Sequence, residues 1–200
     1  KLERGLFEQV HVDPAAAASS IGSRRSMSTA QRMAEDSLTR ITDDGSTLPL
    51  ARGASVLVTG AGTVGKLEVI ARALAESGMR TTALPQPDPE QAAAVAAGVD
   101  AVLVLTSSAA FETPAEQVGL VEALVATGVP VIHASLRNPY DVVHVGEVAV
   151  ALAAYGNADA SLRALAGVLT GEVRTRGKLP VAIPQADGTG EAFPLGHGLR

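Results

Sequence analysis

Short apolar runs alternate with longer stretches of helical periodicity along most of the chain. Runs of strand length occupy 55–59, 80–84, 101–106, 130–134 and 148–153, and helical patterns occupy 64–77, 88–98, 113–128 and 157–170. A run that is apolar throughout, such as 101–106, is typical of a strand buried on both faces of a parallel sheet. The alternation predicts an α/β fold, a three-layer α/β/α sandwich with a mostly parallel sheet, flavodoxin-like in arrangement.

The first fifty residues follow a different pattern. Asp13 and Pro14 form an N-cap followed by a first-turn proline, which predicts a short helix ending before Gly22. A second helix is expected from about Ser28 to a terminator at Gly45. We therefore expect an interdomain connector and helical arm over 1–50 and the sandwich domain over 51–200.

Both ends of the chain carry features that the sandwich alone does not explain. Leu2, Leu6 and Phe7 form an apolar strip with no strand or helix signature, which would need a covering partner. At the other end, prolines bracket the run 179–184 and predict an edge strand, followed by an irregular tail over 193–199. Within the sandwich, the Thr113-Pro-Ala-Glu sequence predicts a capping box.

Composition excludes several classes of function. Aromatic residues make up only 2% of the chain, so the core must be built from Ala, Val and Leu. A net charge of −5, with no cluster of basic and stacking residues, argues against nucleic acid as a partner. The absence of cysteine excludes thiolate chemistry but leaves secreted, cell-envelope and cytoplasmic locations open. No apolar run is long enough to span a membrane.

Gly60, Gly62 and Gly65 match the G-x-G-x-x-G spacing that binds dinucleotides at a strand–helix turn. The full motif also needs an acidic residue at the end of the second strand to hold the ribose, and none precedes Asp88, which is expected to cap a helix. Any tight strand–helix turn uses glycine, so the motif is incomplete evidence for a cofactor. A dinucleotide-binding module stays an alternative, and we expect no cofactor.

No group of residues has the spacing of a catalytic or metal site. Asp43 and Asp44 are adjacent carboxylates, but they stand in a predicted helix-terminating turn. The four histidines are too scattered for a metal cluster, and His133, inside an apolar strand, is expected to bond a backbone carbonyl. Ser135, Asp141 and His144 suggest a hydrolase triad, but no G-x-S-x-G motif surrounds Ser135 and all three lie within ten residues of one loop.

The best polar constellation is the loop that contains Arg137, Asn138, Tyr140 and Asp141. It follows a predicted parallel strand, and binding residues of α/β sheets gather at that carboxyl edge. A turn set by Pro139, with Asn138 and Asp141 bonding nearby backbone, explains the same residues equally well. Two interpretations stay open, a structural turn and an interface or substrate-proximal loop.

Several segments resemble one known family in the same order along the chain. They are 1–7 with 12–14, 36–45 with 48–50, 177–184 and 193–199. Together they resemble the C-terminal α/β sandwich domain of the family 3 glycoside hydrolases over essentially all 200 residues. The loop 136–141 and the short chain are most similar to the bacterial β-N-acetylhexosaminidase branch.

The resemblance implies a parent enzyme larger than this chain. In that family the catalytic residues lie in an N-terminal TIM barrel, which in this branch carries a Lys-His-Phe-Pro-Gly motif, an Asp-x-His pair and an aspartate nucleophile. None of these segments is present in the sequence. The implied parent is a retaining hydrolase of terminal β-linked N-acetylglucosamine. This chain would be its non-catalytic domain, with the barrel and the parent's carbohydrate substrate as partners; a protein-interaction scaffold is the other alternative.

Overall fold

The computed structural model describes residues 2–5, 7, 11, 13–62, 64–107 and 113–199. Its α-helices are α1 (Pro14–Ser20), α2 (Arg24–Ser37), α3 (Val64–Glu76), α4 (Pro89–Ala96), α5 (Ala115–Val125) and α6 (Asp159–Thr170). Short 3-10 helices are η1 (Leu2–Arg4) and η2 (Pro139–Val143). The strands are β1 (Thr39–Asp43), β2 (Ser55–Gly60), β3 (Arg80–Pro85), β4 (Ala101–Thr106), β5 (Val131–Ser135), β6 (Val150–Ala153), β7 (Ile183–Pro184) and β8 (Glu191–Phe193).

A six-stranded sheet in the order β1-β6-β5-β4-β2-β3 forms the centre of the fold. The five strands β2 to β6 are parallel, and β1 joins β6 antiparallel at one edge. Strand β3 lies on one side of β2, and β4 lies on the other side. The order in which successive strands are added therefore reverses between β2 and β4. The α/β sandwich expected from the sequence is confirmed.

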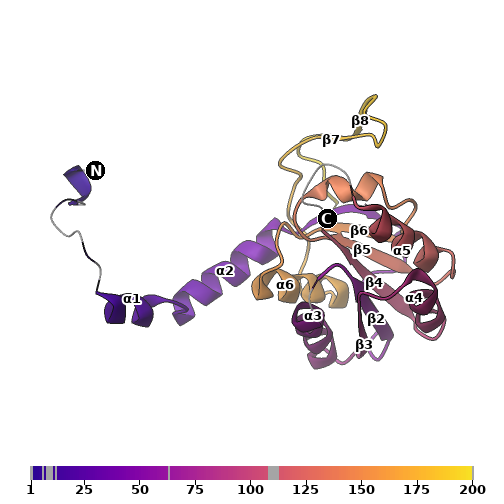
Figure 1. Ribbon diagram of the computed structural model, residues 1–200, viewed down its shortest axis with the longest axis horizontal. Coiled ribbons are helices and arrows are strands. Elements are labelled where there is room, and N and C mark those ends of the chain that lie inside the picture. Colours follow the sequence, from indigo (N-terminus) through magenta and orange to yellow (C-terminus); the bar gives the residue numbers. More distant parts are fainter. Residues whose placement is uncertain are drawn as a thin grey trace.

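Helices cover the two faces of the sheet unequally (Figure 1). On one face α3 packs on α6, and α6 packs on the end of α2, over the largest core cluster. On the other face α4 packs on α5 over the β2–β4 region. None of the described α-helices continues this second layer over β6 and β1; η2 and the C-terminal segment cover that region instead, around Ile41, Val142 and Leu179. Loop residues therefore take part in closing the core.

The helix expected from Ser28 to Gly45 was wrong beyond Ser37. The chain turns at Leu38 and forms β1, whose Thr39 lies opposite Ala153 on β6. Leu38 and Ile41, three residues apart, fit a helical pattern, but they are buried in two different core clusters. A partner strand distant in sequence decides the conformation of this segment, and local periodicity cannot reveal such a partner.

The C-terminal segment also differs from expectation. The run 179–184 is not an edge strand of the main sheet: only Ile183–Pro184 is a strand, and it pairs with β8 in a separate ribbon. The tail is partly ordered by the edge strand, because the Leu199 amide donates to the Arg40 carbonyl at 2.8 Å. The His197 ring also lies 2.8 Å, at Nε2, from the Ile41 carbonyl oxygen. The tail thus covers the outer side of β1.

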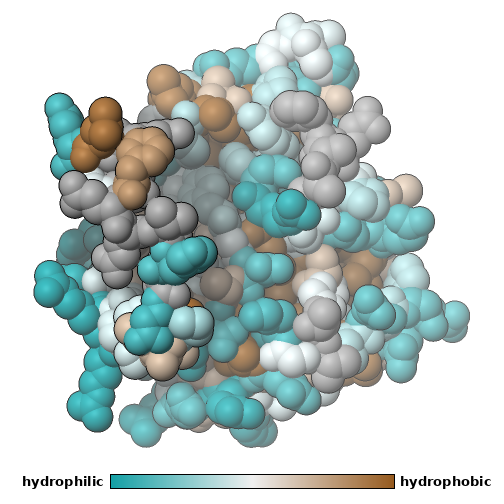
Figure 2. Space-filling model, turned by 60° about the vertical axis from the view of Figure 1, so that its left-hand side comes forward, coloured by the Kyte–Doolittle hydropathy of each residue, from teal (hydrophilic) through white to brown (hydrophobic). Residues whose placement is uncertain are grey.

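The N-terminal arm extends away from the sandwich, with α1 and the start of α2 clear of its surface (Figure 1). Asp13 caps α1 through the Ala15 amide, as expected. Apolar side chains at Leu2, Phe7, Ile21 and Met27 are exposed. Figure 2, which brings this side forward, shows apolar residues scattered among polar ones. None of the described helices is long and apolar enough to cross a membrane.

Candidate functional site

A buried polar cluster lies at the carboxyl edge of the sheet, under the loop that the sequence singled out. Thr106 ends β4, and it is the register partner of Ser135, which ends β5. His133 stands two residues before Ser135, so all three side chains share one face of the sheet. Asp141 enters the cluster from η2, and all four residues are fully buried.

The Thr106 hydroxyl connects the cluster. It donates a hydrogen bond to Asp141 Oδ2 and lies 2.8 Å from His133 Nε2. Because that hydroxyl has one proton, the Nε2 atom of His133 must be the donor in the second bond. Burial lowers the pKa of His133 to about 3, so the ring is neutral at ordinary pH. The expected bond from His133 to a backbone carbonyl was wrong, because a side-chain hydroxyl takes that place.

Asp141 is the unusual member of the cluster. Burial raises the pKa of its carboxyl, and the hydrogen bond from Thr106 and the nearby Thr113 hydroxyl oppose this rise. The Thr113 hydroxyl is close to Asp141, yet it does not reach the geometry of a formed hydrogen bond, and Asp141 Oδ1 also lacks a partner. A buried carboxyl with so few donors favours its protonated form.

The structure gives the loop residues different roles. Asn138 caps η2 by accepting from the Tyr140 amide at 3.3 Å, and Pro139 is buried. Asn138 and Tyr140 are half-buried, whereas Arg137 is exposed. The local-turn interpretation holds for Asn138, but Asp141 bonds a distant side chain, not the nearby backbone.

The helical arm reaches the sandwich at this same edge. Thr39, which follows the end of α2, lies opposite Ala153 at the carboxyl end of β6. The Tyr155 hydroxyl donates to Thr39 Oγ1 at 3.0 Å and fastens this junction. The root of the arm and the 136–144 connection therefore lie at one end of the sheet.

The glycine motif forms the turn after β2, and the backbone of this turn contacts β4. The Ala61 amide donates to the Leu105 carbonyl at 2.7 Å, so this donor faces the sheet and not a ligand. A cavity of about 440 Å³ remains beside Gly60 and Gly62, and its described lining includes Glu116 and no cationic side chain. Asp88 caps α4, as expected, by accepting from the Gln91 amide. Thr63, inside the motif, lies outside the described residues.

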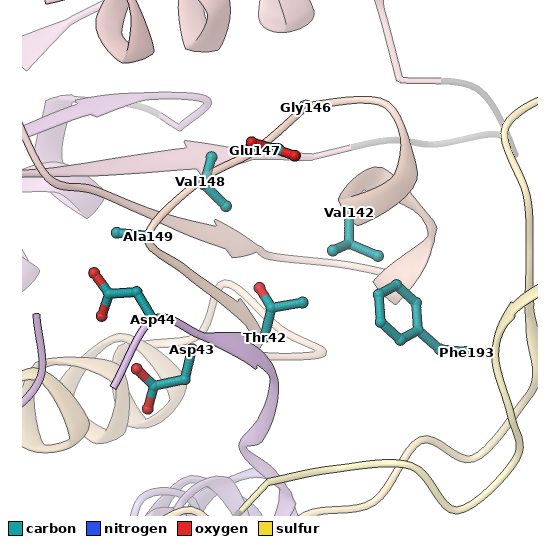
Figure 3. A pocket seen from close by; sticks show the side chains of 9 residues that line it. All are labelled: Thr42, Asp43, Asp44, Val142, Gly146, Glu147, Val148, Ala149 and Phe193. Carbon is teal, nitrogen blue, oxygen red and sulfur yellow. The ribbon is translucent and has the colours of Figure 1, made fainter. Parts of the chain in front are cut away.

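Asp43 and Asp44 line a different cavity of about 390 Å³, with Glu147 and Phe193 (Figure 3). They end β1 and not a helix, which corrects the expected setting. Asp43 pairs with Arg40. Backbone hydrogen bonds from Ser46 and Thr47 lower the pKa of Asp44 to about 2.

The three carboxylates of this cavity diverge in Figure 3. Each aspartate is used in its own turn or ion pair, so neither is poised as a proton donor. Across the described ranges, no three His, Asp or Glu side chains are placed to hold a metal ion.

Two residues of the buried cluster were missed by sequence reasoning. Thr106 is the polar end of an apolar strand, a signal that could have placed it beside Ser135 at the carboxyl edge. Thr113 was assigned to a capping box, but α5 begins at Ala115 after Pro114 and has no side-chain cap bond. Ser135 Oγ lacks a partner, so it does not join Asp141 and His144 in a triad.

Comparisons with known proteins agree with this architecture. No curated protein matches the chain significantly. Among solved structures, a glycoside hydrolase family 3 β-N-acetylglucosaminidase from a Paenibacillus species is similar, with 30% identity and a TM-score of 0.69 over 80% of this chain and 33% of its own. A β-glucosidase from Erythrobacter marinus shares the fold, with 20% identity and a TM-score of 0.79 over 98% of this chain and 38% of its own. So does a β-glucosidase from Listeria innocua in complex with glucose, with 18% identity and a TM-score of 0.78 over 98% of this chain and 36% of its own.

This chain spans only about a third of the length of these proteins. Residues 41–200, which include the whole sheet except the first two residues of β1, match the family described as "Glycosyl hydrolase family 3 C-terminal domain". The chain therefore belongs to the glycosyl hydrolase family 3 C-terminal domain family.

Proposed function

We propose that this chain is the non-catalytic C-terminal domain of a retaining family 3 hydrolase that removes terminal β-linked N-acetylglucosamine. The observation that carries the choice of sugar is the 30% identity to a β-N-acetylglucosaminidase. The two β-glucosidases compared above are 20% and 18% identical and share the fold alone. Membership of the family implies a preceding catalytic domain, which we propose to be a TIM barrel.

The described carboxyl groups support a non-catalytic role. A retaining glycosidase needs two carboxyl groups about 5 Å apart, one of them with a raised pKa to act as the acid. Among the described aspartates and glutamates, Asp141 has a raised pKa, but it is fully buried and out of reach of a saccharide. Asp44 has a lowered pKa and closes a turn. The chemical step is therefore assigned to the preceding domain.

We also propose that the carboxyl edge of the sheet faces that domain. The arm enters the sandwich at this edge through Thr39, and Arg137, Asn138 and Tyr140 stand on the adjacent connection. Arginine and tyrosine are favoured at interfaces because each combines contact area with hydrogen bonding. Leu2 and Phe7 are exposed on the arm and would be buried by contact with the same partner. Leu6 lies outside the described residues.

Enzyme assays test the proposal directly. The polypeptide that includes the preceding domain should cleave aryl β-N-acetylglucosaminides with a higher kcat/KM than aryl β-glucosides. This chain alone should cleave neither. Turnover by this chain, abolished by replacing one of its own aspartates or glutamates, would overturn the non-catalytic assignment. A full-length protein that prefers β-glucosides would overturn the choice of sugar, and a full-length protein with no hydrolase activity would favour the scaffold alternative.

A further inference from the structure

The connection after β5 is tied through Asp141 to the end of the neighbouring strand β4. Residues 107–113 follow β4, and residues 136–144 follow β5, the strand paired with β4. Asp141 belongs to the second connection, but its described hydrogen bond is to Thr106, where the first connection begins. The hydroxyl of Thr113, where the first connection ends, also lies close to Asp141. One carboxyl group thus joins the connection after β5 to the end of β4 and lies near Thr113, just before α5.

Burying the Asp141 carboxyl in this way costs free energy of folding, so stabilising the core does not explain it. Asp141 is fully buried, and its Oδ1 atom has no hydrogen-bond partner. A buried polar group in this condition contributes less to stability than an apolar side chain of the same shape would. Such a group can still fix one conformation, because its hydrogen bonds are directional whereas apolar contacts are not. The geometry of Asp141 therefore favours a role in placing the loop.

The protonated form of Asp141 would fit the surrounding atoms. His133 Nε2 donates to Thr106, whose hydroxyl donates to Asp141 Oδ2. A proton on the Asp141 carboxyl would then be available to the nearby Thr113 hydroxyl, which lacks a partner of its own. In that form a continuous chain of donors joins the interior of β5 to the end of the first connection.

We propose that Asp141 is a positioning residue that anchors the connection after β5 to the end of β4 and so presents Arg137, Asn138 and Tyr140 to the preceding domain. Thr106 and Thr113 are its partners in this role. His133 holds the Thr106 hydroxyl in place by donating a hydrogen bond to it. This inference rests on the proposed function only in naming the preceding domain as the partner. The coupling between this connection and the end of β4 does not depend on the sugar that the enzyme cleaves.

Amide hydrogen exchange on the full-length polypeptide tests the coupling. Thr106→Val keeps the shape of the side chain and removes the hydroxyl, so amides of 137–144 should exchange about tenfold to a hundredfold faster. Amides inside β4 and β5 should keep their rates. Thr106→Ser should restore slow exchange. Asp141→Asn should stay close to the original protein, because an amide can accept from Thr106 and donate to Thr113, whereas Asp141→Ala should match Thr106→Val.

Ser135→Ala is the matched control. It removes a buried hydroxyl on the same face, one that has no hydrogen-bond partner, and it should leave exchange over 137–144 unchanged. Faster exchange by equal factors in the loop and in both strands would show general destabilisation and overturn the positioning role. Unchanged exchange over 137–144 in Thr106→Val would overturn it as well.

Domain docking provides a second readout. If Asp141 acts by presenting the loop, protease cleavage of the arm within 13–23 should become faster in Thr106→Val and in Arg137→Ala. The double variant should then show less than the product of the two fold-changes, because both changes affect the same contact. Multiplicative effects would overturn the inference. Neither exchange nor proteolysis uses a sugar, so a wrong choice of substrate would leave both results interpretable.

Discussion

Gly60 on β2 and Leu105 on β4 are in such close backbone contact that residue 60 cannot carry a side chain. A Cβ atom built on Gly60 would stand 2.2 Å from the Leu105 carbonyl oxygen. The backbone of Gly60 also has φ +100°, a conformation that favours glycine. The first glycine of the motif is therefore required by strand packing, whether or not a ligand binds.

Replacing Gly60 and Gly65 one at a time should show which glycine of the motif the packing of the fold requires. Gly60→Ala should destabilise the fold by roughly 3 kcal/mol or more, because the clash and the unfavourable φ act together. Gly65→Ala should be neutral or stabilising by about 0.5–1 kcal/mol, because this position lies in α3 with open space around it. Denaturant unfolding of both variants measures the difference. Equal stabilities would show that the close contact at Gly60 is not required.

NAD and FAD should not bind with useful affinity. Among the residues that the structure describes around Gly60 and Gly62, the cavity offers a pyrophosphate the carboxylate of Glu116 and no cation. Lys66, the basic residue in the first turn of α3, is paired with Asp159 at 2.8 Å. Titration calorimetry would contradict this prediction if it gave a micromolar dissociation constant that weakens when Gly62 is replaced by a bulky residue.

The sequence predicted the strands that local patterns determine. Ala101–Thr106 was predicted with its observed bounds because a strand buried on both faces is apolar throughout. β1 could not be predicted in this way, because Thr39 becomes a strand residue through pairing with Ala153, which is far away in the sequence. Pro114 likewise suggested a first helical turn, but Thr113 turns away from α5 toward Asp141.

The candidate site was predicted only in part for the same reason. The loop with Arg137 and Tyr140 could be found because it follows a parallel strand, and binding residues gather there. The bond between Thr106 and Asp141 joins the end of β4 to η2 across the sheet edge, and no spacing in the sequence encodes it. Side-chain partners across loops follow from the fold, so they become visible only in the structure.

The stability of the domain should fall with acid because of His133. The ring is fully buried and neutral, with a pKa near 3 in the folded state against 6.5 as the reference value. The unfolded chain therefore binds a proton between these values and the folded chain does not. The contribution is fully present above pH 6.5 and is lost as pH falls toward 3, by up to about 5 kcal/mol in the limit.

Asp141 should act in the opposite direction. Its pKa is raised in the folded state, so its contribution is fully present below 3.8 and is lost as pH rises through the folded value. Unfolding free energies measured from pH 4 to 7 should therefore rise less steeply with pH in His133→Gln than in the original protein. Asp141→Asn should make the rise steeper. A slope unchanged by His133→Gln would contradict the buried, neutral state of the ring.

Arg137 should contribute to domain docking and not to the chemical step. It is exposed beside η2, at the edge of the sheet where the arm enters. In the full-length enzyme, Arg137→Ala should weaken docking by roughly 1–2 kcal/mol, since arginine often contributes strongly at interfaces. The pH profile of kcat/KM should stay unchanged, because this profile reports the acid and base of the free enzyme. Arg72→Ala, at an exposed position on α3, is the control and should change neither. A shifted pH profile in Arg137→Ala alone would place this residue next to the reacting groups and contradict a role limited to docking.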